Sequence, residues 1–200
     1  MSESGHAVIE TDPAIIEKIA KLTDDDLLAL QLVALGRSDA YISTKMYLTC
    51  RSRQVAVNTV KARLVRIRNK TGLGNRLHMA LFYVDHILPH ETPEGYRHGQ
   101  LLAEWRAQAE QYRADLQQAG ALRPIRVAAV NILLLPGHAN KSDGELGRLI
   151  TPPGHKIMSG DSFRHHLSDL GRQLSGRSSR VRLAVIARLA PLGKENEGWR

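Results

Sequence analysis

Basic side chains between Ala40 and Val84 form the part of this sequence best suited to binding a charged ligand. The segment holds nine Lys or Arg residues and no Asp or Glu. Guanidinium and ammonium groups donate hydrogen bonds to phosphate oxygens, and each phosphate that they neutralise releases condensed counterions. A long run of one charge therefore indicates a polyanionic partner, and nucleic acid is the usual one. The alternative is a merely solvated basic surface, which the complete absence of acidic residues disfavours.

Apolar residues at helical spacing run through this basic segment. Over residues 53–70 they recur every three or four positions and predict one buried helix face, made of Val57, Val60, Leu64 and Ile67. The remaining positions carry Arg and Lys, which suit guanine, and Asn, which suits adenine. We therefore predict a helix over about Arg53–Lys70 whose polar face meets nucleic acid.

Start and stop signals predict helices on both sides of this one. Asp12 is followed by a proline, and Thr23 has an acid three positions later at Asp26; both patterns mark helix starts. A short helix is expected over about Asp39–Met46, and a further one from Arg76 to about His86.

Charge divides the chain into four blocks. Residues 1–39 carry a net charge of −5, residues 40–84 of +9, residues 85–120 of −3 and residues 121–200 of +7. The acidic block begins with a loop rich in Pro and Gly, and residues 98–118 are typical of a helix. That helix has three open roles: a spacer, a packing helix or a dimer contact.

The two positive blocks resemble each other. Three apolar positions of the first align with three of the second when Val60, Leu64 and Ile67 are set against Phe163, Leu167 and Leu170. Ser38-Asp39 likewise matches Ser142-Asp143, and a second acid-free run follows between Leu170 and Lys194. The chain is therefore predicted to hold two diverged copies of one unit.

Residues 22–80 contain a series of apolar, small and basic residues at fixed spacing: Leu22-Thr23, Leu30, Val33-Ala34, Gly36, Ser38, Ile42, Met46, Leu48, Thr59-Val60-Lys61, Leu64, Ile67, Lys70, Leu73 and Arg76. With these residues the segment resembles the DNA-binding domain of the LuxR/NarL/FixJ family of bacterial regulators. The resemblance implies a four-helix helix-turn-helix domain whose third helix enters the major groove. It also implies that Val60 is buried, that Lys61 faces DNA and that Arg76 opens the fourth helix.

One departure from the family pattern lies between Leu48 and Thr59. This chain has about seven more residues there, which is nearly two helical turns. The extra residues either lengthen the reading helix or enlarge the turn before it. Region four of sigma factors shares much of the same motif.

Composition excludes several other classes. The net charge is +8 and the single Cys50 allows no internal disulfide, which is typical of a reducing compartment. Neither a membrane span nor a signal peptide is predicted, so the expected location is the cytoplasm, associated with the nucleoid. His86 and His90 are separated by Pro89 and do not predict a metal site. No grouping of nucleophile, base and orienting residue indicates an enzyme, and no cofactor motif is present.

The sequence thus predicts an all-α protein with two small helix-turn-helix modules joined by a helical connector. The expected domains are residues 1–88, a loop and connector at 89–120, a second module at 121–192 and a tail at 193–200. The expected function is a sequence-specific transcriptional regulator of repressor type that binds double-stranded DNA. Because the modules differ, they are expected to read an asymmetric site as a monomer. Such a compact regulator would suit a phage or a mobile element.

The residues predicted to contact DNA are the exposed polar positions of the two reading helices and their flanks: Arg51, Arg53, Asn58, Thr59, Lys61, Arg63, Arg66, Lys70, Ser162, Arg164, His165, Arg172 and Arg177. Asp161 and Ser162 are candidates for capping the second reading helix. Three alternatives stay open. They are a homodimer through residues 98–118, a nonspecific architectural DNA- or RNA-binding protein, and a sigma-like regulator that docks on RNA polymerase.

Overall fold

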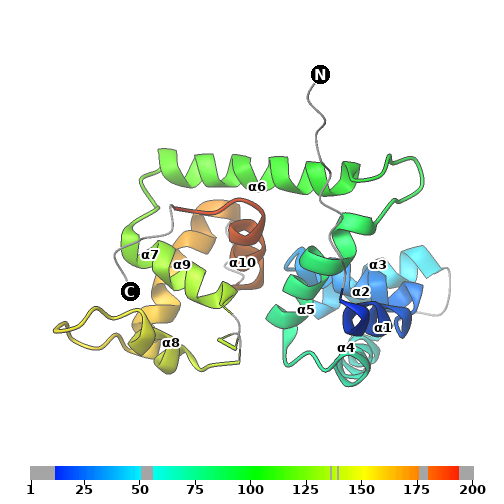
Figure 1. Cartoon of the computed structure of the whole chain (residues 1–200), viewed down its shortest axis with the longest axis horizontal. Helices are drawn as coiled ribbons and strands as arrows, with labels where there is room; N and C mark the ends of the chain where they lie inside the picture. Colours follow the sequence, from blue (N-terminus) through cyan, green and yellow to red (C-terminus); the bar gives the residue numbers. More distant parts are fainter. Residues whose placement is uncertain (1–11, 51–55, 136, 139, 176–179, 194–200) are drawn as a thin grey trace.

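The chain is described by a computed structural model covering residues 12–50, 56–135, 137–138, 140–175 and 180–193 (Figure 1). Within these residues all regular structure is helical, with ten α-helices and no strand. The predicted all-α class is therefore confirmed. The apolar residues recur at the helical period, so each helix has one face to bury and can do so only against other helices.

The first part of the chain forms five helices: α1 (Pro13–Ala20), α2 (Asp24–Ala34), α3 (Asp39–Cys50), α4 (Val57–Thr71) and α5 (Arg76–Phe82). Both predicted helix starts are confirmed. Asp12 accepts a hydrogen bond from the Ala14 amide at 2.9 Å, and Thr23 and Asp26 form a reciprocal capping box. Each cap satisfies amides that the first turn of a helix leaves without partners.

Substitution of Thr23 tests whether its side chain caps α2. Replacing Thr23 with alanine removes the acceptor of the Asp26 amide, so we expect the free energy of unfolding to fall by about 1 kcal/mol. Urea unfolding followed by circular dichroism measures the change. Thr23→Ser keeps the hydroxyl and should stay near the unsubstituted protein; an equal loss in both variants would contradict the capping role.

Two predicted helix bounds were wrong. Helix α4 begins at Val57 and not near Arg53, because Ala56 has an extended backbone with φ −66° and ψ 150°. Helix α3 continues past Met46 to Cys50. The extra residues of this region therefore do not extend α4 back to Arg53. The helix predicted from Arg76 to about His86 is present: α5 ends at Phe82 and continues directly into a π-helical turn η1 (Tyr83–Ile87), which a 3-10 turn η2 (Leu88–His90) follows.

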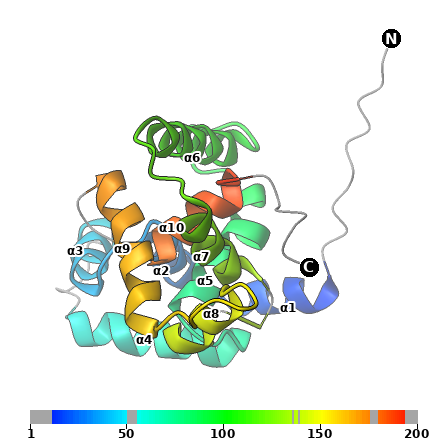
Figure 2. The ribbon, with the colours of Figure 1, turned by 90° about the vertical axis from the view of Figure 1, so that its left-hand side faces the viewer.

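The second part repeats the order of α2 to α5 with four helices: α7 (Pro124–Leu134), α8 (Asp143–Leu149), α9 (Gly160–Ser175) and α10 (Arg180–Leu189). We call α2–α5 the first helix group and α7–α10 the second. Between them, α6 (Gln100–Gln118) lies across both groups, on the side away from α4 (Figures 1 and 2). It packs on α9, α10 and η2, so of the roles left open by the sequence it has that of a packing helix.

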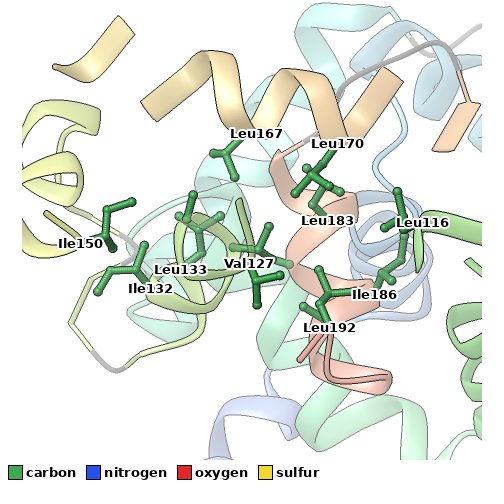
Figure 3. Close-up of a cluster of buried hydrophobic side chains, with 14 of the residues drawn as sticks. Leu116, Val127, Ile132, Leu133, Ile150, Leu167, Leu170, Leu183, Ile186 and Leu192 are labelled. Carbon is green, nitrogen blue, oxygen red and sulfur yellow. The ribbon is translucent and has the colours of Figure 1, made fainter. Parts of the chain in front are cut away.

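Two apolar clusters hold the groups together. The second-group cluster joins α6, α7, α9 and α10, and Figure 3 shows Leu133, Leu170 and Leu183 among its members. The first-group cluster contains Leu30 and Ile42. Of the positions predicted to be buried in α4, Val60 and Ile67 are fully buried and Leu64 is half-buried, but the prediction for Val57 was wrong: at the first turn of α4 it is 37% exposed. In α9, Phe163 and Leu170 are fully buried.

Helices α5 and α10 exchange side chains between the two clusters. Leu77 and Leu81 of α5 pack into the second-group cluster, Val185 of α10 belongs to the first-group cluster, and Val181 of α10 packs against both. Leu77 and Val181 are separated in sequence by the same number of residues as Leu81 and Val185. Equivalent residues therefore make reciprocal contacts, which is the pattern of a two-fold, isologous interface within one chain.

Ion pairs also recur at equivalent places in the two groups. Arg76 pairs with Asp39 in the first group, and Arg180 pairs with Asp143 at 2.8 Å in the second. Each pair joins the last helix of its group to the start of the second helix. The two groups thus share a contact as well as a helix order.

Candidate nucleic-acid interface

One side of α4 is attached to α2 through a buried carboxylate. Asp26 is completely buried and receives Lys70 Nζ at 2.8 Å and Arg63 Nη1 at 3.4 Å. Arg63 also pairs with Asp25 at 2.8 Å, and Arg66 Nη2 lies 3.6 Å from Asp26. Arg63 and Lys70 are therefore held by the protein itself, although both were predicted to contact DNA.

Electrostatics favour the ionised form of Asp26. Burial alone would raise the pKa of this carboxyl, but hydrogen bonds from Lys70 and Thr23 and the Lys70 charge outweigh burial, so its pKa lies below the ordinary value. Asp26 thus stays charged while it orders the cations around it. A buried carboxylate of this kind fixes the rotation of α4 about its own axis.

The opposite side of α4 is exposed. Its members recur at helical spacing and face solvent together; we call them the α4 surface, made of Asn58, Lys61, Val65, Arg68 and Asn69. Val65 keeps half of its area exposed. The surface therefore combines amide, cationic and apolar groups.

Each group on the α4 surface matches a feature of duplex DNA. Among the described residues, no hydrogen bond or ion pair engages the charged ends of Lys61 and Arg68, so both can donate to a ligand. Arg and Lys donate to guanine or phosphate, Asn bonds adenine, and a small apolar side chain contacts the thymine methyl group. The arrangement has the chemistry needed to read base edges in a major groove.

The corresponding face of α9 is also exposed, but its cations lie beside acids. Arg164 pairs with Asp161 at 2.7 Å and with Asp143 at 3.2 Å. Arg172 pairs with Asp169, and His165 Nε2 lies 3.4 Å from the same carboxylate. The side chains of Arg164, His165 and Arg172 are all at least 60% exposed, so these contacts are weakly held and can be exchanged for a ligand.

An ion pair joins the first and third helices of each group, but its charges are reversed. In the second group Asp169 of α9 pairs with Arg126 of α7 at 2.8 Å. In the first group the third helix, α4, carries the cation Arg66, and α2 carries the acid Asp26. The second group therefore holds α9 by an equivalent contact but places the acid on that helix. The effect is to make the α9 face less positive than the α4 surface.

The remaining predicted site residues fall into two sets. Thr59 and Ser162 are exposed near the starts of α4 and α9. Arg51, Arg53 and Arg177 lie outside the described residues. The expected cap of α9 was misplaced: the Ser162 amide donates to Ser159 Oγ at 3.1 Å, so Ser159 caps the first turn and Asp161 and Ser162 lie within it.

Three residues of the α4 surface were missing from the predicted site: Val65, Arg68 and Asn69. Their signal was present in the sequence, because all three continue the three- and four-residue spacing that begins at Asn58 and Lys61. Apolar Val65 was overlooked because an apolar residue is normally assigned to the core.

Other kinds of site find no support in the described part of the chain. Its His, Cys, Asp and Glu side chains form no group of three or more that could hold a metal ion. None of its helices is long and apolar enough to cross a membrane. Comparison of the chain with family models, with curated proteins and with solved structures gives no match in any of the three.

Proposed function

We propose that this protein is a sequence-specific DNA-binding transcriptional regulator of repressor type, in which the two helix groups are two unlike helix-turn-helix modules. The α4 surface is the observation that carries the proposal. Its exposed cations and amides lie opposite a face that is anchored by Val60, Ile67 and the Asp26 ion pairs. A helix of this kind fits the width of the major groove.

The packing around α4 supports the same function. Helix α3 precedes α4 in the sequence and packs against it, and α2 packs against both. This order, two successive helices on a supporting helix, supports the proposed helix-turn-helix. The basic residues are therefore presented by a rigid element, which specific recognition requires.

The second module is proposed to contribute less to affinity. Its exposed cations must exchange Asp143, Asp161 and Asp169 for phosphates before they gain anything, whereas Lys61 and Arg68 carry no such cost. The reciprocal α5–α10 contact relates the modules as an inverted pair. A monomer would therefore bind two unlike half-sites in inverted orientation, one strongly and one weakly.

The primary test is selection of a binding sequence followed by mutation of the α4 surface. A random duplex library should return one motif, and fluorescence anisotropy then measures affinity for it. Lys61→Ala and Arg68→Ala should each weaken binding about tenfold or more, since each removes a charged donor to DNA. The matched control is Arg106→Ala, which removes one exposed charge from α6 on the far side of the molecule (Figure 2).

Two results would contradict the proposal. If no motif is selected and random DNA competes equally across a salt series, binding is nonspecific and the protein is architectural. If Arg106→Ala weakens binding as much as Lys61→Ala, net charge and not the α4 surface determines affinity.

The weaker role of the second module is tested separately. The double substitution Arg164→Ala with Arg172→Ala should reduce affinity less than Lys61→Ala alone and should shorten the footprint at one end of the site. A palindromic footprint occupied by two chains would contradict the monomeric arrangement. Sedimentation of the complex distinguishes one chain from two.

A further inference from the structure

Val65 lies in the middle of the α4 surface and is its only apolar member. It follows Lys61 by one helical turn and precedes Arg68 and Asn69 by another, and half of its area is exposed. Exposed valines are common on protein surfaces, so exposure alone assigns Val65 no role. Its position among the polar groups that are proposed to meet DNA does.

The rotation of α4 keeps Val65 on this surface. Val60 and Ile67 are fully buried on the opposite side of the helix, and the ion pairs of Asp26 hold α4 against α2. Turning α4 far enough to cover Val65 would expose both buried side chains and break these ion pairs. Val65 therefore faces the ligand that the α4 surface binds.

A valine that enters a major groove can discriminate between base pairs in one way. Its side chain has neither donor nor acceptor, so it gains nothing from the nitrogen and oxygen atoms of the base edges. The C5-methyl group of thymine is the apolar group that base pairs present in the major groove. Because valine branches at Cβ, its side chain occupies few rotamers and loses little freedom when it covers that methyl group.

The spacing along α4 places three contacts within a short stretch of duplex. Each residue advances an α-helix by about 1.5 Å, so Lys61 and Arg68 lie about 6 and 4.5 Å from Val65 along the helix axis. Successive base pairs are separated by about 3.4 Å. The two cations therefore meet DNA within about two base pairs of Val65, one on either side, and hold its side chain against the bases.

We propose that Val65 is a specificity residue that makes the α4 half-site depend on the methyl group of one thymine. This inference rests on the proposed DNA-binding function and adds to it the chemical group that is read. Lys61 and Arg68 supply affinity through their charges, whereas Val65 selects thymine at its own position.

Replacement of thymine by uracil removes this methyl group and leaves the hydrogen-bonding groups of the base unchanged. The selected duplex is synthesised with uracil at one thymine position at a time, and fluorescence anisotropy measures each affinity. We expect one position at which uracil weakens binding of the unsubstituted protein about fourfold, which is the effect of burying one methyl group.

Val65→Ala assigns the sensitive thymine to its contact. The substitution removes two methyl groups from an exposed position, and alanine favours a helix more than valine does, so the fold is kept. The ratio of affinities for the thymine and uracil duplexes should fall from about fourfold to about twofold or less, because the methyl group has lost its partner. Lys61→Ala should weaken binding to both duplexes and leave the ratio near fourfold.

Leu135→Ala is the matched control. Leu135 is 48% exposed and Val65 is 50% exposed, but Leu135 follows α7 and lies outside the α4 surface. Its replacement shortens an equally exposed apolar side chain, so it should change neither the affinity nor the ratio.

Two results would overturn this role of Val65. One is a selected motif in which uracil at no thymine position affects affinity. The other is a sensitive thymine whose ratio stays near fourfold in Val65→Ala, since another side chain then reads the methyl group. Either result leaves the Lys61 and Arg68 measurements, and with them the proposed function, intact. Failure to select any motif contradicts the proposed function, and the role of Val65 is then overturned with it.

Discussion

Replacing Asp26 with asparagine should lower the free energy of unfolding by about 2–4 kcal/mol. The carboxylate is fully buried and is the shared partner of Arg63, Arg66 and Lys70. Asparagine has nearly the same shape, so the loss comes from charge and not from packing. Without the carboxylate, Lys70 loses its ion pair and Arg63 keeps only its pair with Asp25. Urea unfolding followed by circular dichroism measures the change.

Asp24→Asn is the matched control for this substitution. Asp24 lies in the same first turn of α2 but is exposed, so its replacement removes the same charge and only a favourable interaction with the helix dipole. That interaction contributes about 0.3–1 kcal/mol. Equal losses in the two variants would show that Asp26 has no special role in holding α4.

The pH dependence of the Asp26 contribution has a definite sign. The folded-state pKa lies below the ordinary value of 3.8, so the unfolded chain binds the proton more readily. The stabilisation is therefore complete above about pH 4 and is lost as pH falls through the folded-state pKa. The stability difference between the unsubstituted protein and Asp26→Asn should shrink over that range. A difference that stays constant down to pH 2 would contradict the assignment.

Replacing Phe163 with alanine should cost about 3–5 kcal/mol. Phe163 is fully buried and packs in the second-group cluster, so its loss leaves a cavity under α9. Val185 of α10 completes the first-group cluster, and Leu77 of α5 belongs to the second. Because each core contains a residue of the other group, we expect the whole protein to unfold in one transition at lower urea concentration.

Two probes separate cooperative from independent unfolding of Phe163→Ala. Circular dichroism reports all helices, and Trp105 in the Trp199→Phe background reports the junction with α6. Coincident transitions support a shared core. Two separate unfolding transitions, of which only one moves to lower urea concentration in Phe163→Ala, would show that the helix groups unfold independently. Phe163→Leu keeps most of the apolar volume and should cost less than half as much.

Local sequence signals predicted the helices well where one residue type decides the outcome. Asp12 and Thr23 cap the helices expected of them, and α5 begins at Arg76 as predicted. Where several candidates compete, the prediction was wrong. Ser159, Asp161 and Ser162 can all cap a helix, and the position used depends on how α9 packs against α8.

The sequence predicted that α4 carries a basic, polar face, but it did not predict which cations of α4 stay exposed. The helical period determines which residues of α4 share a face, so the stripe from Asn58 to Asn69 could be derived from spacing alone. The period does not determine which face another helix covers. Asp26 decides this for Arg63 and Lys70, and it lies 37 and 44 positions away in sequence.

The sequence by itself determined the helical class, most of the buried faces of α4 and α9 and the concentration of positive charge. These follow from interactions between residues a few positions apart, which spacing reveals. The tertiary structure alone decided which cations remain available to a ligand and how α5 and α10 join the two groups. These depend on contacts between residues distant in sequence. The type and spacing of a residue do not identify such a partner.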